Sequence, residues 1–256
     1  MPFGETAIVT ALNPVPNEDN TTTVPDSLGT TRNGVNVDAQ PGGEATTEDD
    51  GLAVLGDLET GDLDLVFDSD PALPFTVMAD GDVYDLAVGY DGTTATAFPN
   101  FPIRYPVGGN VVTFGEDADV AEVDDAVDVD GNTVFFEGPF TGDLTIEGTD
   151  VLLFGEGFTG RDILLDGSVE VRGTGVRIRG FTITGDVTVF GDDFGMAFTV
   201  VQGTTQINGD AVAFLRNAFC QGATVPSSTA SLLDNTGLSP LPDPDPTLCE
   251  RPDGGP

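Results

Sequence analysis

The chain has 256 residues and a formal net charge of −36, from 44 Asp and Glu residues against 8 Arg, with no Lys and no His. Such a charge is strongly self-repelling in dilute buffer, whereas in molar salt the Debye length falls to about 3 Å and screens the repulsion. We therefore expect a salt-adapted protein of a haloarchaeon or of a haloarchaeal virus. The same charge excludes nucleic acids and anionic membrane surfaces as partners, because both require Lys or Arg.

The first half of the chain reads as an arm followed by a small β-domain. Residues 1–50 are rich in Thr, Asn, Pro and Gly, with one apolar patch between Ala7 and Leu12, and predict an extended N-terminal arm that becomes ordered on a neighbouring surface. Residues 51–106 contain alternating apolar and acidic positions and Asp-Gly turns at 80–81 and 91–92, which predict a small antiparallel β-domain. Three prolines within residues 98–106 favour a linker at its end.

From residue 107 to residue 225 the sequence repeats itself. Rungs that begin at Gly131, Gly148, Gly173, Gly191 and Gly209 are spaced by 17, 25, 18 and 18 residues and carry apolar residues at offsets three, five and ten. A period of about 18 residues, with short alternating strands and glycines at the corners, is typical of a solenoid. We therefore predict an all-β chain whose second half is a short parallel β-helix of about five rungs. A β-sandwich is the alternative, but it does not require constant offsets.

Two segments of this region resemble a known superfamily. Residues 120–126 form a candidate cap turn followed by Asp-Gly-Asn-Thr-Val at 130–134, and residues 176–185 read Val-Arg-Ile-Arg-Gly-Phe-Thr-Ile-Thr-Gly. Over roughly residues 110–220 the chain resembles the pectate-lyase-like right-handed parallel β-helix superfamily. The resemblance implies the fold but no particular activity, because this scaffold is shared by lyases, hydrolases, adhesins and viral spikes.

The enzymes of that superfamily use residues that this chain lacks. Its hydrolases combine carboxylates with His and Lys, and its lyases combine a calcium-binding carboxylate cluster with an Arg. Asp192 and Asp193 read as a solvated corner, and Asp128 to Asn132 starts like a calcium loop but has Pro139 where a bidentate Glu is required. We therefore expect no catalytic residue, no cofactor and no metal site.

The outward positions of the first strand of each rung are less polar than a solvated face requires, which predicts a covered face. Either a sister copy in a ring, with a trimer favoured over a pentamer, or the preceding β-domain would cover it. Four of the eight arginines lie between residues 161 and 179, and they either pair with acidic residues of adjacent rungs or form a docking patch for an acidic neighbouring subunit. The arginines are Arg161, Arg172, Arg177 and Arg179, and the acidic candidates are Glu147, Asp150, Glu156 and Glu170. The candidate interface residues are Phe135, Leu152, Phe154, Arg177, Arg179, Ala213 and Leu215.

Residues 226–256 are predicted to form a proline-rich C-terminal tail. Cys220 at the end of the last rung and Cys249 in the tail are candidates for a disulfide that ties the two together. The beginning of the chain lacks the basic and apolar regions of a signal peptide, and we expect synthesis in the cytoplasm followed by incorporation into a virus particle. A cytoplasmic location is the alternative.

These observations favour a non-enzymatic structural or attachment component of a halophilic archaeal virus, such as a capsid turret, a decoration protein, or a tail spike or fibre. The N-terminal arm would contact other virion proteins, and the β-helix would contact a cell-surface glycan or an S-layer. We expect a homo-oligomer, no nucleic acid and no membrane insertion. The alternative function is that of a carbohydrate-active or polysaccharide-binding β-helix protein of a haloarchaeon.

Overall fold

The structure is a computed structural model, which is all-β apart from one helix within its described residues. The described residues are 6–12, 34–47, 52–56, 58–68, 72–78, 82–90, 92–97, 102–105, 110–116, 118–155, 163–225, 231–233, 235 and 249. The chain divides after Gly108 into two compact units, which are described separately below. Within the described residues, no helix has the length and apolar character that crossing a bilayer requires.

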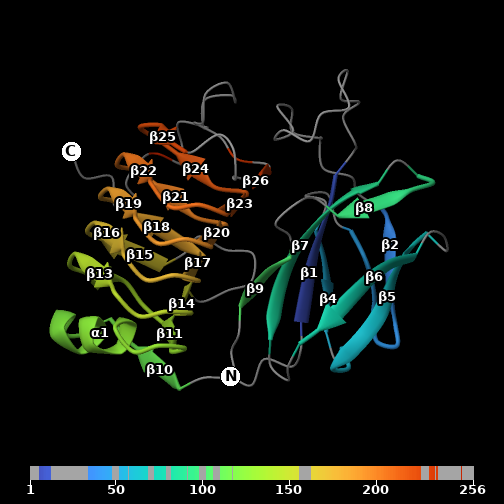
Figure 1. The fold of residues 1–256 in the computed structure, drawn as a ribbon, viewed down its shortest axis with the longest axis horizontal. Coiled ribbons are helices and arrows are strands. Elements are labelled where there is room, and N and C mark those ends of the chain that lie inside the picture. The colour runs from blue at the N-terminus through green and yellow to red at the C-terminus, as the bar shows by residue number, and fades with distance from the viewer. Residues whose placement is uncertain are drawn as a thin grey trace. The chain divides into compact units, whose positions relative to one another are not determined.

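The first unit contains two β-sheets (Figure 1). One has the strand order β4-β1-β7-β8, with β9 also paired to β7, and the other has the order β3-β2-β5-β6. Among the strand pairs described in this unit, only β1–β7 is parallel. The strands are β1 (Thr6–Leu12), β2 (Asn36–Gln40), β3 (Glu44–Thr46), β4 (Leu52–Leu55), β5 (Gly61–Phe67), β6 (Ala72–Val77), β7 (Val83–Tyr90), β8 (Ala95–Ala97) and β9 (Ile103–Tyr105).

This unit corrects two predictions about the first half of the chain. Residues 1–50 are not simply an extended arm, because their apolar patch forms β1 and pairs with the buried strand β7 over seven positions, and their alternating Val35, Val37 and Ala39 are buried in the other sheet. Residues 103–105, predicted to be linker, form β9, since the flanking prolines leave three residues that can pair. Residues 1–5, 13–33 and 48–50 of the predicted arm lie outside the described residues.

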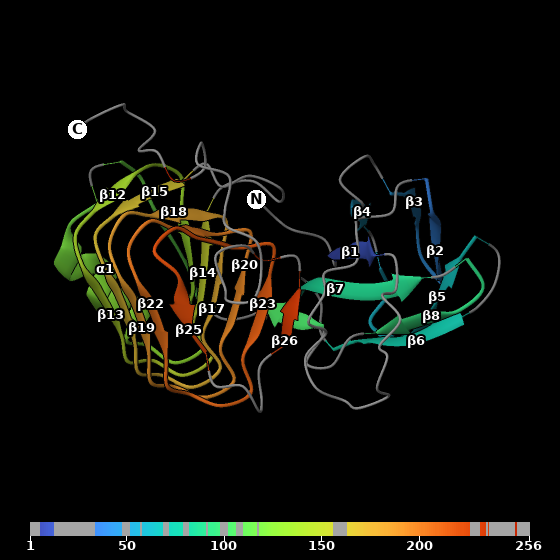
Figure 2. The ribbon, with the colours of Figure 1, turned by 90° about the horizontal axis from the view of Figure 1, so that it is seen from above.

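The second unit is a parallel β-solenoid built from three sheets (Figures 1 and 2). We call them the first, second and third sheets, in the order in which each rung visits them. The first sheet contains β10 (Val111–Phe114), β11 (Thr133–Phe136), β14 (Leu152–Gly155), β17 (Arg177–Arg179), β20 (Gly195–Ala197), β23 (Ala213–Leu215) and β26 (Ser231–Leu233). The second contains β12 (Phe140–Thr141), β15 (Ile163–Asp166), β18 (Phe181–Ile183), β21 (Val200–Val201) and β24 (Ala218–Phe219). The third contains β13 (Leu144–Ile146), β16 (Val169–Val171), β19 (Val187–Val189), β22 (Thr205–Ile207) and β25 (Ala223–Thr224).

The interior of the solenoid consists of columns of apolar side chains, one residue from each rung. Because side chains alternate between the two faces of a strand, the middle residue of each three-residue strand of the first sheet points inward. The pairing places these residues directly above one another, and each is fully buried: Val134, Leu153, Ile178, Met196 and Phe214. These columns confirm the predicted parallel β-helix.

The register of the first rung differs from the prediction by two residues. Thr133 pairs with Leu152 and Phe135 with Phe154, so the spacing from β11 to β14 is 19 residues and not 17. The prediction equated Gly131 with Gly148, but Gly131 is equivalent to Asp150, since both backbones have a positive φ, of 72° and 56°, at the same corner.

The solenoid also continues beyond the predicted end at residue 225. Strand β26 pairs with β23 and forms the seventh strand of the first sheet, within the segment that was predicted to be a tail. Asn235, which follows it, is fully buried.

The glycine column explains why one corner of the repeat is constant. A Cβ atom added to Gly173, Gly191 or Gly209 would overlap the carbonyl oxygen of the glycine one rung earlier, which is Gly148, Gly173 or Gly191 respectively. Only glycine permits this close approach of successive backbones. The glycines that defined the repeat in the sequence therefore reflect a packing constraint between rungs.

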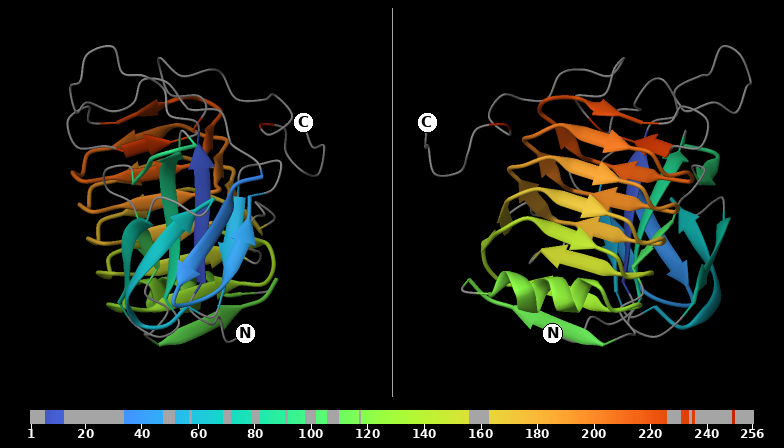
Figure 3. Two further views of the ribbon diagram at one scale, coloured as in Figure 1. Left: turned by 90° about the vertical axis from the view of Figure 1, so that its right-hand side faces the viewer. Right: turned by 60° about the vertical axis from the view of Figure 1, so that its left-hand side comes forward.

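Helix α1 (Val120–Val127) caps the third sheet at the first rung (Figure 3, right). The Asp119 carboxylate accepts a hydrogen bond from the Ala121 N–H at 2.8 Å, which is a typical N-cap. The helix buries Val123, Ala126 and Val127 in the solenoid core and contacts β13. It thus covers the edge of the third sheet at that end.

Candidate functional site

The seven candidate interface residues lie on one face of the solenoid, the outward side of the first sheet, which we call the ladder face. One column contains Leu152, Arg177 and Ala213, and the next contains Phe135, Phe154, Arg179 and Leu215. Sequence reasoning had placed Phe135 in the column of Leu152, and the two-residue register shift moves it to that of Phe154.

Aromatic rings and guanidinium groups stack along the ladder face. The ring centroids of Phe135 and Phe154 are 5.5 Å apart. The Arg179 guanidinium carbon lies 5.6 Å from the Phe154 centroid and 4.5 Å from the Phe198 centroid, and the Arg216 guanidinium lies 5.9 Å from the latter. Arginine over an aromatic face is an attractive cation–π contact, and it is stronger where water is excluded. Arg179 is fully buried, so this column is a structural stack.

Four apolar side chains of the ladder face have little exposed surface. Leu152, Phe154, Ala213 and Leu215 have exposed fractions of 0%, 2%, 6% and 0%, although none of them belongs to the interior cluster of the solenoid. The predicted contact between copies at these positions stays a prediction.

Two arginines form ion pairs with acidic residues of the same or an adjacent rung. Arg172 contacts Glu147 at 2.9 Å and Glu170 at 2.5 Å, and Arg177 contacts the Asp193 carboxylate at 3.0 Å. The Glu147 and Glu170 pairs agree with the first of the two interpretations from the sequence, but exposed pairs contribute only about 0–1 kcal/mol each. Arg161 and Glu156, which were part of that interpretation, lie outside the described residues.

Aspartate carboxylates hydrogen-bond successive rungs at the corners. Asp143, Asp186 and Asp192 each accept a backbone N–H from the next rung, donated by Ser168 at 2.7 Å, Thr204 at 2.7 Å and Asp210 at 2.8 Å. The Thr204 hydroxyl also donates to Asp186, and these two bonds lower the pKa of the Asp186 carboxyl. Asp192 is exposed at its corner, as the sequence predicted, and its carboxylate also bonds to the next rung.

The segment that resembled a calcium loop has the same role at the helical cap. Asp128 accepts the Glu147 N–H at 3.1 Å and Asp130 accepts the Thr149 N–H at 2.7 Å. Asp124 of α1 accepts the N–H of Thr145, two residues before Glu147. In the outermost strand of a sheet, every second backbone N–H group points away from the sheet and has no neighbouring strand to bond to. The three carboxylates accept hydrogen bonds from such N–H groups at this end of the third sheet.

The first unit contains a buried cluster of titratable groups that sequence reasoning missed. The Asp82 carboxylate is 1% exposed and accepts hydrogen bonds from the Tyr84 hydroxyl at 2.8 Å and from Arg104 Nε at 2.7 Å. Burial raises the pKa of Tyr84 to about 12, so the phenol stays protonated at neutral pH. On the same strand, the fully buried Asp85 accepts from the Tyr105 hydroxyl at 2.6 Å. The cluster links β7 to β9 and has the character of a structural network.

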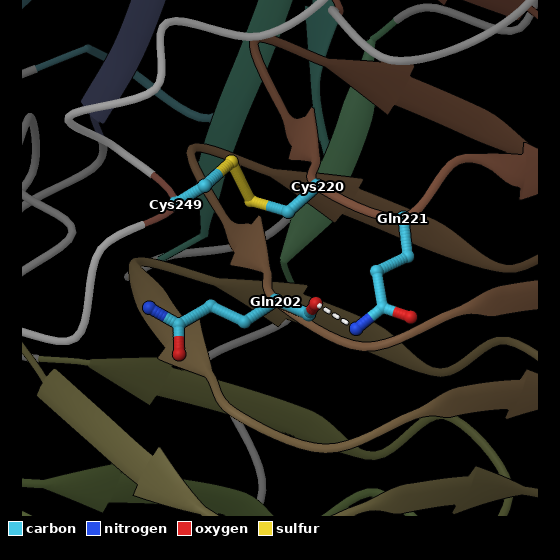
Figure 4. Close-up of a disulfide and its surroundings, with 4 residues drawn as sticks. All are labelled: Gln202, Cys220, Gln221 and Cys249. Atoms are coloured by element: carbon cyan, nitrogen blue, oxygen red, sulfur yellow. Dashed lines mark hydrogen bonds between the residues drawn. A yellow bond between two sulfur atoms is a disulfide. The ribbon is translucent and has the colours of Figure 1, made fainter. Parts of the chain in front are cut away.

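Cys220 and Cys249 are joined by a disulfide at the late rungs of the solenoid (Figure 4). Close to it, the Gln221 amide donates to the Gln202 carbonyl oxygen of the preceding rung at 3.0 Å.

A buried asparagine ladder continues the rungs past residue 225, because the Asn217 N–H donates to the Asn235 side chain at 2.9 Å. The 18-residue spacing of these two asparagines was visible in the sequence but was obscured by the prolines around it.

The outward face of the third sheet divides by charge. Its first two rungs carry Thr145, Glu147, Glu170 and Arg172, and Arg172 pairs with the two glutamates as described above. Its late rungs present only uncharged side chains, and we call this region the neutral patch. It consists of Thr188, Phe190, Gln206, Asn208 and Thr224.

Among the residues that the structure describes, no group of three or more His, Cys, Asp or Glu side chains is arranged to hold a metal ion. The comparisons with known proteins give no match to this chain, whether to a protein-family model, to a curated protein or to a solved structure.

Proposed function

We propose that this protein is a non-enzymatic structural or attachment component of a virus particle that infects halophilic archaea, such as a turret, a decoration protein, or a tail spike or fibre. In this role the solenoid is a rigid support that presents a surface to the host cell. The likeness to pectate-lyase-like β-helices is part of the same proposal, since viral spikes share that scaffold.

The observation that carries the proposal is how the solenoid uses its polar side chains. Asp128, Asp130, Asp143, Asp186 and Asp192 all accept hydrogen bonds from the next rung, so these carboxylates serve rigidity. Catalysis by carboxylates instead requires groups that face a substrate with pKa values suited to proton transfer. The lowered pKa of Asp186 fits a permanently ionised acceptor.

The composition supports the halophilic part of the proposal. A net charge of −36 with no Lys favours folding only where salt screens the repulsion. Particles of a halophilic virus assemble and persist in such salt.

Immunogold electron microscopy tests the proposal directly. Antibodies raised against the purified chain would be applied to particles purified in 3 M salt from a haloarchaeal culture that produces the protein. We expect gold at regular positions on the particles, and label confined to cell debris would refute a virion role.

The neutral patch favours a second candidate, a polysaccharide-binding or carbohydrate-active protein of a haloarchaeon. The purified chain would be incubated with uronate polymers in 3 M KCl, and the polymer length would be followed by size-exclusion chromatography. Shortening of a polymer would support the enzyme and contradict our first proposal.

A further inference from the structure

We propose that the neutral patch of the third sheet, made of Thr188, Phe190, Gln206, Asn208 and Thr224, binds an uncharged glycan chain. The inference rests on the proposed attachment function and names the partner and the surface that would carry it.

The first argument is the distribution of charge. The chain has 44 acidic residues, and the first two rungs of the same face carry Glu147, Glu170 and Arg172 beside the uncharged Thr145. In the late rungs the equivalent outward positions are uncharged and are occupied by Thr188, Phe190, Gln206, Asn208 and Thr224. A solvated face of a salt-adapted protein would be expected to continue with Asp or Glu. The change to uncharged side chains therefore calls for a separate reason.

The second argument is the geometry of the patch. Thr188, Gln206 and Thr224 lie directly above one another on three successive strands, which are about 4.8 Å apart. The Gln206 amide donates to the Asn208 side chain at 3.2 Å, which orients both groups. Amide and hydroxyl groups both donate and accept hydrogen bonds, so this column is suited to a chain of hydroxyl groups that do the same.

The third argument is the exposed aromatic ring. Phe190 is 54% exposed and is the only large apolar side chain with high exposure among the described residues of the solenoid rungs beyond α1 and the turn that follows it. An aromatic ring at the surface offers a flat apolar face, against which the C–H face of a sugar ring can pack, while the neighbouring amides bind its hydroxyl groups.

The salt environment selects the same kind of partner. At molar salt the Debye length is about 3 Å, so recognition through exposed charges is weak. Hydrogen bonds and apolar packing at short range are not screened in this way. A neutral glycan is thus a partner that this surface can recognise under the conditions to which the composition is adapted.

The test measures binding of the full chain, in 3 M KCl, to immobilised mannan, dextran and chitin oligomers, with polygalacturonate as the acidic probe. The same protein, fluorescently labelled, is tested for adsorption to haloarchaeal cells. The variants are Phe190→Ala and Gln206→Glu, and the matched control is Glu170→Gln, on the same face but in the charged early rungs. Circular dichroism confirms that each variant is folded.

We expect the wild type to bind at least one neutral glycan in preference to polygalacturonate, and Phe190→Ala and Gln206→Glu to weaken that binding by about tenfold or more, with Glu170→Gln unchanged. The inference is overturned if no neutral probe binds, or if both patch variants bind as the wild type does. Adsorption to cells separates the two proposals. If the wild type adsorbs to cells and the patch variants adsorb equally well, glycan binding by the neutral patch is overturned but the attachment function is kept. If the wild type does not adsorb, the result counts against the attachment function itself.

Discussion

At one corner of the solenoid, five successive rungs each have a residue whose backbone lies in the left-handed region. The φ values are 72°, 56°, 75°, 54° and 56° at Gly131, Asp150, Gly175, Asp193 and Ala211. Glycine adopts this conformation freely and aspartate tolerates it, whereas alanine gains nothing there to offset the steric cost. Ala211 is therefore the position of this column at which a substitution can improve the fold.

We predict that Ala211→Gly raises the free energy of unfolding by about 1 kcal/mol, because the steric cost of a Cβ at positive φ is removed. Urea unfolding in 3 M KCl measures the change. Ala213→Gly, two residues later in strand β23, is the matched control and should be destabilising, since glycine weakens a strand. Equal effects of the two variants would show that the corner is not strained.

Two aspartates are expected to respond to pH in opposite directions. Burial, and then the like charges of Asp128 and Asp125, raise the pKa of Asp124, so the folded state favours its protonated form and gains stability as pH falls through that pKa. Because the pKa of Asp186 is lowered, its ionised carboxylate stabilises the folded state at pH values above the ordinary pKa of 3.8. This stabilisation is lost as the pH falls through the pKa of the folded state. At pH 7 in 3 M KCl we expect Asp124→Asn to raise the melting temperature and Asp186→Ala to lower it. Both differences from the wild type should shrink at pH 3, and differences that do not depend on pH would contradict these roles.

At the scale of the element, the glycine column is the most sensitive part of each rung. We predict that Gly191→Ala lowers the free energy of unfolding by about 1–3 kcal/mol or more, because the new methyl group would overlap the carbonyl oxygen of Gly173. Gly115→Ala is the control, because a Cβ there meets no atom within 4 Å. Thermal melting of the two variants in 3 M KCl distinguishes a packing effect from a general effect of losing glycine.

The elements that sequence reasoning predicted well are those with a regular period. The inward columns that contain Ile178 and Met196 were predicted because the 18-residue spacing is constant there. The register of the first rung was wrong because Gly131 fits the repeat as a residue type, whereas its positive φ and the strand pairing make it equivalent to Asp150, two residues after Gly148. Strand β26 was missed because the prolines in residues 226–256 obscure the period in the sequence. The N-terminal strands were missed since their pairing with β7 and β5 is distant in sequence.

The ladder face shows a different limit of the sequence. Its apolar columns favoured a covered face, and what covers it stays a prediction. The stacking of Arg179 between Phe154 and Phe198 could not be predicted, because Phe198 lies at a corner and joins the stack only through its positive φ of 51°. Corner residues follow the backbone conformation, which apolar periodicity does not report.

The disulfide between Cys220 and Cys249 joins the late rungs to a segment 29 residues further along the chain. In the chain-entropy model, closing a loop of this length stabilises the folded state by about 3–4 kcal/mol. We expect the Cys249→Ser variant to melt at a lower temperature than the oxidised wild type. Thiol titration of the denatured, unreduced wild type should find no free thiol, and two thiols per chain would exclude the bond.

At the scale of the whole molecule, stability should depend on salt. The net charge of −36 repels itself over the whole surface, and lowering the salt from 3 M to 0.1 M lengthens the Debye length from a few Å to about 10 Å. We predict that at 0.1 M KCl the melting temperature falls greatly or the protein unfolds. Circular dichroism at the two salt concentrations measures this change. An unchanged melting temperature would refute salt adaptation.

The corner aspartates also define which acidic residues can be replaced. A version of this protein for work in ordinary buffer would need far less negative charge, and the obvious route is to change Asp to Asn or Ser throughout. Asp128, Asp130, Asp143, Asp186 and Asp192 should be kept, because each joins one rung to the next through its carboxylate. Substitution elsewhere on the surface would lower the charge without opening the corners. The acidity of this chain is thus made of two separable parts, one that suits the solvent and one that belongs to the scaffold.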